Sequence, residues 1–243
     1  MTTNRTTITT KMQADYDAIA AAFSLSRKDM RWPEIDELVA RIKPKSTVLD
    51  VGCGMGRLYA LLKDKPVEYL GIDVSAGQIE QAKAAYPDGA FVQGLMTDLP
   101  CANDSQDAVV MIASLHHLLR REDRQKALAE AKRVLRPGGL LYITAMNLWP
   151  RKYWSLFFQK KPGLATLTEE ERGFVGFADV FLPWTWKVGA PVYRYYHAFT
   201  KRELRKLATR AGFDLESVVY AKNGHRSHRF VAKNLVLVAR KNV

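Results

Sequence analysis

The chain has 243 residues, of which 47% are hydrophobic and 10% are aromatic, enough to bury one sizeable core. This composition excludes an intrinsically disordered chain, a collagen and a small disulfide scaffold. The 37 Lys and Arg residues outnumber the 25 Asp and Glu residues and give a formal net charge of +12. Such an excess points to a polyanionic partner but does not separate nucleic acid from a membrane surface.

The basic excess is concentrated in the C-terminal two-fifths of the chain. Residues 1–147 contain 19 basic and 18 acidic residues, whereas residues 148–243 contain 18 basic and 7 acidic residues. This asymmetry predicts a polyanion-binding face in the second part, with a merely solvated basic surface as the alternative.

The two cysteines and the N-terminal residues bear on the cellular compartment of the protein. Cys53 and Cys101 are too few for a disulfide framework and lack metal-ligand spacing, so we expect a reducing compartment and no metal. Residues 1–11 have no apolar core segment and predict a disordered tail rather than a signal peptide. No apolar run reaches the roughly 18 residues of a membrane-spanning helix. We therefore expect a soluble cytoplasmic protein that does not bind membranes.

Hydrophobic periodicity gives the predicted elements in chain order. Two helices are predicted within residues 12–42, separated near Trp32-Pro33. Strands are then predicted at 48–51, 68–73, 90–93, 107–113 and 140–145, and helices at about 56–64, 76–86 and 121–135. Residues 148–196 are an aromatic stretch with four of the five tryptophans, too long for an ordinary connection. A helix at 201–211 and strands at 215–220 and 235–239 close the chain.

Strands that alternate with helices predict an α/β fold with a doubly wound, mostly parallel, seven-stranded sheet. We expect residues 12–243 to form a single domain. Its predicted parts are an N-terminal helical extension (12–44), a cofactor-binding core (45–147), a substrate insertion after the fifth strand (148–198), and a closing helix and strands (199–243).

A glycine cluster marks the predicted cofactor site. The segment from Asp50 to Gly56 contains three glycines at a strand-to-helix turn, where the backbone can approach a ligand closely. Asp73 ends the next strand, 17 residues after Gly56, where a carboxylate can accept hydrogen bonds from both ribose hydroxyls. The two features predict a nucleoside-cofactor site at the carboxyl edge of the sheet.

The glycine spacing discriminates between cofactors. NAD sites use Gly-x-Gly-x-x-Gly, whereas this chain has Gly-x-Gly-x-Gly. Asp50 would repel a pyrophosphate but attract, directly or through water, the amine of a methionine-type sulfonium. The pattern therefore favours S-adenosylmethionine over NAD.

Residues 48–56 resemble the first motif of class I methyltransferases, and Gly71–Ser75, Asp98–Pro100 and Val134–Gly139 resemble their later landmarks. The resemblance covers residues 45–147 and implies a Rossmann-like fold that binds S-adenosylmethionine. The cofactor contacts that it implies come from Asp50, Gly52, Cys53, Gly54, Gly56, Asp73, Val74, Leu95, Met96, Asp98 and Ala113.

One position departs from that pattern. Leu95 stands where many such enzymes have an acid that binds the adenine amino group. Either Asp98 makes this contact or the backbone around Met96 holds the adenine. The loss of one hydrogen bond, worth about 0.5–1.5 kcal/mol, need not abolish binding.

The flanking segments resemble the eukaryotic-type tRNA wobble-uridine carboxymethyl methyltransferases. The matching segments are Tyr16–Ala20, Phe23–Arg27 with Trp32-Pro33, Ile112–His117, Leu182–Trp184, Arg194–Phe199 and Asn234–Lys241. The resemblance implies methyl esterification of 5-carboxymethyluridine in the anticodon stem-loop of tRNA. It also raises a small zinc-binding activator protein as a partner, and one sequence does not decide whether this chain needs it.

A carboxylate substrate is already ionised at neutral pH, so its methylation calls for orientation more than for a strong base. The candidates for a cationic or hydrogen-bonding clamp are Arg27, Arg194 and His197. His116 is a further catalytic candidate, because it follows the fourth strand at the ligand edge of the sheet, where the catalytic groups of the family cluster. For stacking a base we expect Trp184, Tyr195 and Tyr196, and for contacting phosphates Lys222, Arg226 and Arg229.

Structural roles compete with each of these predictions. Either histidine of the His116-His117 pair can be a core residue, residues 193–199 can be the packed start of the next helix, and the tryptophans can simply cover the core. Two other functions also remain open. One is a small-molecule carboxyl or hydroxyl methyltransferase with residues 148–196 as an aromatic lid; the other is a non-catalytic binding protein, which the intact Gly52, Gly54 and Asp73 disfavour.

Overall fold

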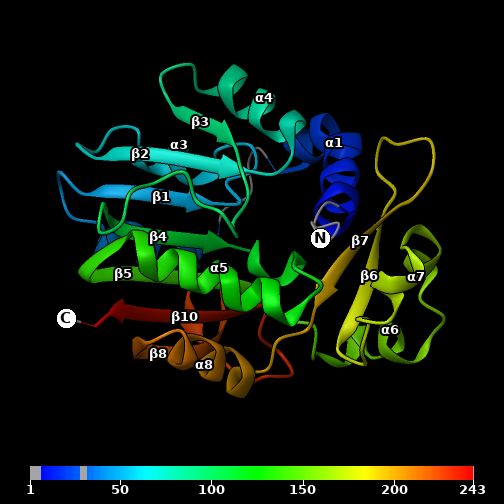
Figure 1. Ribbon diagram of the computed structural model, residues 1–243. Coiled ribbons are helices and arrows are strands. Elements are labelled where there is room, and N and C mark those ends of the chain that lie inside the picture. The colour runs from blue at the N-terminus through cyan, green and yellow to red at the C-terminus, as the bar shows by residue number, and fades with distance from the viewer. Residues whose placement is uncertain (1–6, 28–31, 243) are drawn as a thin grey trace, which may run out of the picture.

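The computed structural model describes residues 7–27 and 32–242, which form an eight-stranded sheet with helices on both faces (Figure 1). The strand order is β3-β2-β1-β4-β5-β10-β8-β9. The strands are β1 (Thr47–Val51), β2 (Glu68–Asp73), β3 (Ala90–Gln93), β4 (Gln106–Ile112), β5 (Leu135–Met146), β8 (Phe213–Lys222), β9 (His225–Arg226) and β10 (Asn234–Lys241). The predicted doubly wound α/β fold is confirmed.

Most of the sheet is parallel, as expected. Strands β1 to β5 pair in parallel, and β10 inserts antiparallel between β5 and β8. The predicted count of seven strands is wrong by one, because β8 turns back on itself through Asn223 and Gly224 into the short β9. Both turn residues have positive φ, 54° and 79°, the geometry that closes two-residue hairpins.

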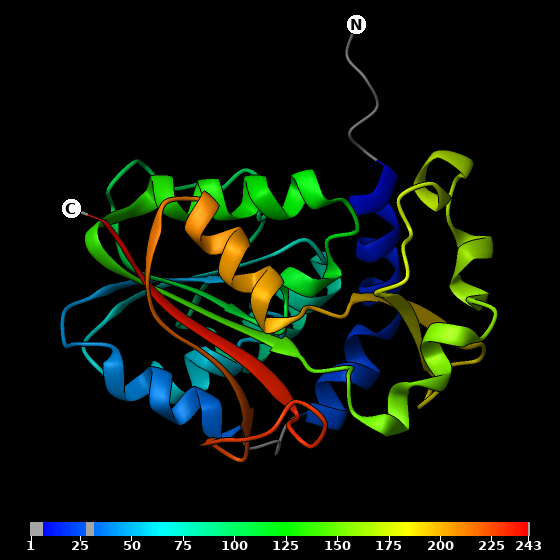
Figure 2. The same cartoon turned by 90° about the horizontal axis from the view of Figure 1, so that it is seen from below.

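The alternation of side chains along the strands builds one core on each face of the sheet. On one face Val48, Val110 and Tyr142 pack with α2 (Pro33–Arg41), α3 (Arg57–Leu62) and α4 (Ala76–Ala85). On the other face Leu49 and Met111 pack with α5 (Arg121–Val134) and α8 (Lys201–Arg210). Figure 2 shows the two helical layers on opposite sides of the sheet.

The segment between β5 and α8 forms a lobe beside the sheet edge. It contains η2 (Arg151–Tyr153), α6 (Ser155–Phe158), η3 (Pro162–Thr166), α7 (Glu169–Arg172) and the antiparallel pair β6 (Asp179–Trp184) and β7 (Val192–His197). The lobe has a small core of its own that includes Phe157, Val180 and Tyr196. Residues 193–197 thus belong to a strand and not to the start of the next helix.

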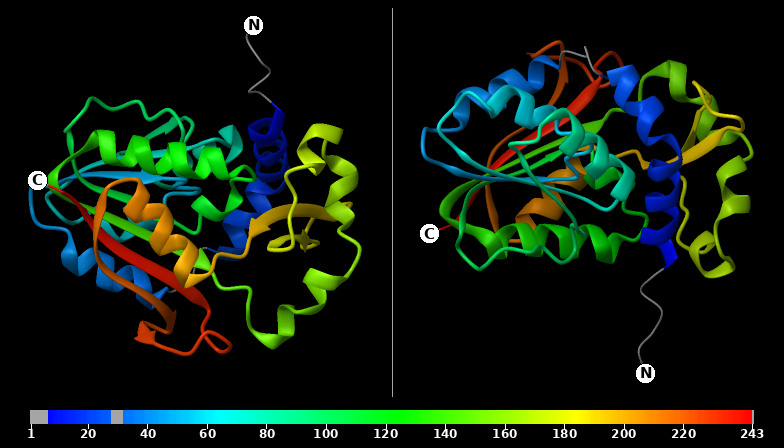
Figure 3. Two further views of the ribbon diagram at one scale, coloured as in Figure 1. Left: turned by 60° about the horizontal axis from the view of Figure 1, so that its bottom comes forward. Right: turned by 90° about the horizontal axis from the view of Figure 1, so that it is seen from above.

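Helix α1 (Thr7–Arg27) lies between the sheet and this lobe (Figure 3). It begins within the predicted tail, of which residues 1–6 lie outside the described residues. Asp17 anchors the helix, because its Oδ1 accepts hydrogen bonds from Ser75 Oγ (2.5 Å) and Gly77 N (2.9 Å) at the start of α4. Within the described ranges, no helix is long and apolar enough to cross a membrane.

Candidate active site

A cleft of about 1380 Å³ opens at the carboxyl ends of β1, β2, β4 and β5. Its floor is the loop after β1 and its far wall comes from α1 and β7, which contribute Tyr16, Arg27, Arg194 and Tyr196. Ligands of open α/β sheets bind at this edge, and the cleft is large enough for a nucleoside cofactor together with a substrate group.

The glycine loop forms the floor of the cleft, and its conformation favours glycine. Gly52 and Gly54 have φ values of +79° and +54°, and a Cβ on Gly52 would lie 2.3 Å from Ser114 Cβ. Both glycines and Cys53 line the cleft, as predicted. Gly56 does not; a Cβ there would meet the Phe91 ring at 2.9 Å, so its predicted cofactor contact is corrected to a packing role.

Asp73 ends β2 with its carboxylate held for a ligand. Its Oδ2 accepts a hydrogen bond from Gly54 N at 2.9 Å and its Oδ1 accepts one from Ser75 N at 3.0 Å. Burial raises the pKa of Asp73, and these backbone donors partly offset the rise. Asp73 and Val74 both line the cleft, so two fixed acceptor oxygens stand where ribose hydroxyls would bind.

Residues 94–98 line the end of the cleft that is expected to hold the adenine. Leu95, Met96 and Asp98 all line it, and Asp98 N donates to Leu95 O at 3.1 Å. Both predicted ways of holding the adenine, by Asp98 or by the backbone near Met96, are therefore open to this loop. Ala113, also predicted, lines the cleft at the end of β4.

Asp50 lies behind the glycine loop and not in the cleft. Its side chain is 2% exposed, and Oδ2 accepts a hydrogen bond from Tyr69 OH at 2.8 Å. Burial raises the pKa of Asp50 to about 7. Its Oδ1 is buried and has no hydrogen-bond partner among the described residues, so the expected attraction to the cofactor amine, directly or through water, stays a prediction.

His116 presents one ring nitrogen without a protein partner. Its Nδ1 accepts a hydrogen bond from Met146 N at 3.3 Å, which places the proton on Nε2. That Nε2 is buried and has no partner among the described residues, although His116 lines the cleft. Burial and then the neighbouring His117 and Arg194 hold the pKa of His116 well below its ordinary value. A neutral N–H donor is therefore free for a ligand.

His117 is a connecting residue. Its Nδ1 lies 2.8 Å from Tyr195 O and its Nε2 lies 2.8 Å from Tyr16 OH. Because a carbonyl oxygen only accepts, Nδ1 donates and Nε2 accepts from the tyrosine hydroxyl. Burial lowers the pKa of His117 to about 3. The ring thus joins α1 to β7 in a single tautomer.

The opposite wall carries guanidinium groups. Arg194 is 7% exposed and lies over the rings of Trp184 (5.1 Å) and Tyr196 (5.4 Å). Within the described part of the chain, no carboxylate oxygen lies within 4.0 Å of Arg194. Arg27 lines the same cleft and lies over Phe23 at 5.3 Å. A buried cation such as Arg194 requires compensation, so an anionic ligand suits this wall.

Arg57 belongs to the same wall and was missed by the sequence reasoning. It lines the cleft and lies over the Trp32 ring at 5.0 Å. Burial, followed by repulsion from Arg27, lowers the pKa of Arg57 to about 10. Its position directly after the glycine loop, as the first residue of α3, was the available signal.

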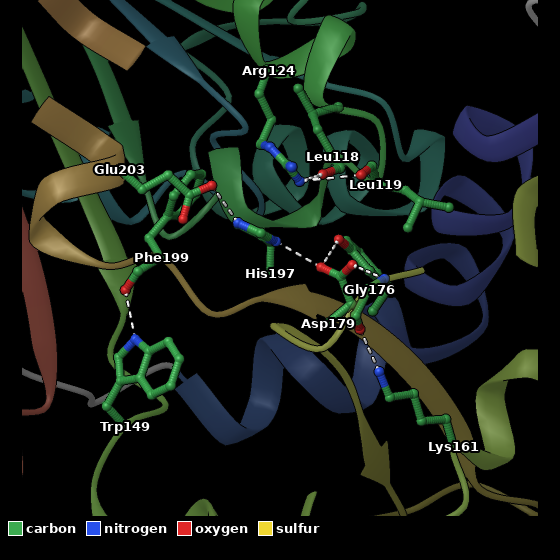
Figure 4. A network of polar contacts seen from close by, with 11 residues as sticks. Leu118, Leu119, Arg124, Trp149, Lys161, Gly176, Asp179, His197, Phe199 and Glu203 are labelled. Carbon is green, nitrogen blue, oxygen red and sulfur yellow. Dashed lines mark hydrogen bonds and ion pairs between the residues drawn. The ribbon is translucent and has the colours of Figure 1, made fainter. Parts of the chain in front are cut away.

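His197 does not line the cleft. Its Nδ1 lies 2.6 Å from Asp179 Oδ1 and its Nε2 lies 2.7 Å from Glu203 Oε1 (Figure 4). Burial opposes the charged form, but these two carboxylates raise the pKa of His197 above its ordinary value. Both ring nitrogens are used in holding β7 to β6 and α8, so the predicted catalytic role of His197 is wrong.

Strand alternation separates the other residues of this segment. Arg194 and Tyr196 face the cleft, whereas Tyr195 points the other way and donates to Asp179 Oδ1 at 2.5 Å. Trp184 is 8% exposed and lies beneath the arginines, outside the cleft lining. Tyr195 and Trp184 are therefore corrected from base-stacking to structural roles.

The three residues predicted to bind phosphates do not all lie at the cleft. Lys222 lines the cleft, but Arg226 and Arg229 do not. Arg226 is exposed on β9, and Arg229 lies over the Trp149 ring at 4.2 Å. The described residues contain no group of three or more His, Cys, Asp or Glu that could hold a metal.

An α/β sheet with this glycine loop and ribose-facing carboxylate defines an enzyme of the nucleoside-cofactor class. Residues 49–143 match the family model described as a methyltransferase domain. A methyltransferase-family protein of Encephalitozoon cuniculi is 31% identical over 203 residues, which are 82% of this chain and 84% of that protein. The chain therefore belongs to the class I S-adenosylmethionine-dependent methyltransferases.

A second relative is the tRNA (carboxymethyluridine(34)-5-O)-methyltransferase of Arabidopsis thaliana, 33% identical over 129 residues. The match covers 53% of this chain but only 31% of that relative, so the chain spans about a third of its length.

Solved structures share the fold at lower identity. A methyltransferase of Methanosarcina mazei has a TM-score of 0.68 at 22% identity, covering 85% of this chain and 97% of that one. A Haloferax volcanii methyltransferase in complex with the Trm112 activator has a TM-score of 0.65 at 19% identity, and the match covers 94% of this chain and 98% of that one. The 1,6-didemethyltoxoflavin-N1-methyltransferase of Burkholderia thailandensis, which holds S-adenosylhomocysteine, has a TM-score of 0.65 at 18% identity. This match covers 96% of this chain and 88% of that one.

The cradle of this chain fits S-adenosylmethionine. The floor carries no side chain at Gly52 or Gly54, and Asp73 offers its two oxygens to the ribose. The bound cofactor supplies a methyl group attached to a positively charged sulfur. The chain's own residues bind it and bring a second reactant to it.

Proposed function

We propose that the protein esterifies the carboxylate of 5-carboxymethyluridine at the wobble position of tRNA. The observation that carries the proposal is Arg194, a buried guanidinium with no ion-pair partner in the described part of the chain, which lines the cleft together with Arg27 and the free Nε2–H of His116. A substrate carboxylate would compensate the buried charge and accept the unused hydrogen bond.

The residues suggest how the reaction proceeds. Arg194 and Arg27 would orient the carboxylate, and His116 Nε2–H would bind one of its oxygens, leaving the other to attack. S-adenosylmethionine bound at Gly52, Gly54 and Asp73 would supply the methyl group, and this oxygen would accept it while the electron pair of the methyl–sulfur bond goes to sulfur. No proton moves, which suits the neutral His116 and His117. Orientation of this kind contributes up to roughly 7–11 kcal/mol.

RNA as the substrate is supported by the charge distribution and by the relatives. Residues 148–243 carry 18 basic against 7 acidic residues, and the Arabidopsis thaliana relative is named for the same wobble-uridine reaction. RNA binding and the cytoplasmic location expected from the sequence belong to this proposal. A small activator protein is a further partner within it, since the Haloferax volcanii methyltransferase is in complex with the Trm112 activator.

Nucleoside mass spectrometry tests the proposal. Wobble-hypomodified tRNA is incubated with the protein and methyl-labelled S-adenosylmethionine, with and without the activator, and then digested. We expect labelled 5-methoxycarbonylmethyluridine.

The second candidate is methylation of a small carboxylic acid. It is favoured by the fold shared with the Burkholderia thailandensis enzyme, named for a small-molecule substrate, and by the aromatic lobe that covers one side of the cleft. Transfer to small acids, with no labelled nucleoside from tRNA, would select it.

A further inference from the structure

One mouth of the cleft is lined by exposed cations. It lies between η2 in the lobe and the loop that joins β9 to β10. Arg151, Lys152, Lys222 and Lys233 line it and are all exposed. None of the four is ion-paired within the described ranges. Glu34, whose Oε1 accepts a hydrogen bond from Gly224 N beside Lys222, is 3% exposed, so the exposed side chains at this mouth are positively charged.

Two exposed aromatic rings stand beside these cations. Trp154 is 45% exposed and Phe230 is 46% exposed, and their rings lie 6.3 Å apart in an edge-to-face arrangement. Trp154 Nε1 donates to Trp149 O at 2.9 Å, and Arg229 lies between Trp149 (4.2 Å) and Phe230 (5.7 Å). The rings are therefore held in place while much of their surface faces solvent.

A supported aromatic surface flanked by unpaired cations fits single-stranded nucleic acid. Bases of any identity stack on aromatic rings, and the cations attract the backbone phosphates. An apolar ligand alone would leave the cations unmatched, and an acidic peptide would leave the rings exposed. Because the same cleft continues to the glycine loop, a strand held at this mouth would deliver a neighbouring base to the cofactor.

We propose that Trp154, Phe230, Arg151, Lys152, Lys222 and Lys233, here called the cleft-mouth platform, bind the nucleotides that flank the target base. The inference rests on the proposed function. The platform defines the path of the RNA strand on either side of the target base and names the residues that hold the strand.

The platform is tested by the affinity of the full chain for an anticodon stem-loop RNA, measured by fluorescence anisotropy. Stacking of a base on an aromatic ring contributes about 1–3 kcal/mol. The double variant Trp154→Ala/Phe230→Ala should therefore bind the RNA about tenfold more weakly or worse. S-adenosylhomocysteine affinity should be unchanged. The matched control is Phe158→Ala, an aromatic residue of the same lobe that is 77% exposed but packs against Phe177 and not against the Trp154–Phe230 pair.

Salt dependence tests the cations. Lys222→Gln/Lys233→Gln should lower the slope of log affinity against log salt by about 0.7 for each phosphate that the variant no longer neutralises. Wild-type RNA binding that survives in the aromatic double variant overturns the platform and leaves the proposed function standing. A wild-type protein that binds no stem-loop RNA, with or without anionic vesicle binding, overturns both.

A separate observation concerns Gln78, in the first turn of α4. Its side chain is 1% exposed, lines the cleft, and has no hydrogen-bond partner for either amide atom among the described residues. A Cβ on Gly54 would lie 3.8 Å from Gln78 Oε1, so the amide stands beside the glycine loop. Leaving such a group unsatisfied costs about 1–3 kcal/mol. We infer that the Gln78 amide hydrogen-bonds the polar part of the adenosyl cofactor.

The isosteric variant Gln78→Leu separates this role from a structural one. The melting temperature without ligand should rise, because a buried unsatisfied amide is removed, while S-adenosylhomocysteine should bind about tenfold more weakly. Equal weakening for 5′-methylthioadenosine places the contact at the ribose; weakening for S-adenosylhomocysteine alone places it at the aminocarboxylate. Unchanged affinity for both ligands overturns the inference.

Discussion

His197 is predicted to stabilise the lobe without taking part in the reaction, and His197→Leu tests this. The variant removes two hydrogen bonds to carboxylates, at 2.6 Å to Asp179 and 2.7 Å to Glu203. Such bonds contribute about 1.5–3 kcal/mol each. The side chain of Asp179 is 6% exposed and that of Glu203 is 38% exposed, so the second bond counts for less because solvent screens it.

We therefore expect a loss of about 2–4 kcal/mol in the free energy of unfolding. For a chain of this size each kcal/mol lowers the melting temperature by about 2–4 °C, which gives a decrease of roughly 5–15 °C. Turnover well below the melting temperature should stay within a few-fold of wild type, because His197 does not line the cleft.

The same network gives a pH dependence. The pKa of His197 is raised above its ordinary value of 6.5, so its contribution is complete below that pH and is lost as pH rises through the raised pKa. Burial opposes ionisation of Asp179 and Glu203, but their pKa values are lowered from 3.8 and 4.5 because His197, together with Tyr195 at Asp179 and the Thr200 backbone at Glu203, stabilises the charged forms. Their contributions are present above those values and are lost as pH falls. The difference between wild type and variant should thus be largest at about pH 5–6.5.

Thermal melts of both proteins across this pH range provide the measurement, with exposed His225→Leu as the control. An unchanged melting temperature accompanied by loss of turnover would refute the structural role and restore a catalytic one.

Three further outcomes are expected. Arg194→Met should reduce turnover at least 100-fold and leave the S-adenosylhomocysteine dissociation constant unchanged in calorimetry; equal loss of both would show that the arginine only maintains the fold. Gly52→Ala should weaken cofactor binding and lower the melting temperature, because its Cβ would lie 2.3 Å from Ser114 Cβ at a φ of +79°, and wild-type affinity would contradict the close-approach argument. Since His116 and His117 are held neutral, with the pKa of His117 near 3, the pH profile of kcat/KM should show no histidine ionisation between about pH 5.5 and 8. A midpoint near 7 is expected only from Asp50 and should disappear in Asp50→Asn, whereas a midpoint that remains in this variant would show a titrating catalytic histidine.

The cofactor half of the site was predictable because it is local in sequence. Gly52, Gly54 and Asp73 follow from two adjacent strand ends, and parallel pairing of β1 with β2 brings them together. Gly56 was misassigned because its neighbour, the Phe91 ring, comes from a strand 35 positions away and only the folded structure shows it.

The substrate half was predicted less well because it depends on strand orientation. Within residues 194–197 the pattern gave an arginine, two tyrosines and a histidine, but not which of them face the cleft. The pairing of β7 with β6 decides this, and it sends Tyr195 and His197 toward Asp179. A one-residue shift in register would have reversed all four assignments.

The chemical form of the transferred methyl group distinguishes esterification of a carboxylate from every other methyl transfer to RNA. Radiolabelled S-adenosylmethionine is incubated with wobble-hypomodified tRNA and the protein, and the recovered tRNA is treated with mild alkali. A methyl ester is hydrolysed to volatile methanol, so we expect the label to leave the RNA, and we expect Arg194→Met to transfer almost none. Label that remains on the tRNA after alkali, as on a ring nitrogen or a ribose oxygen, would contradict it.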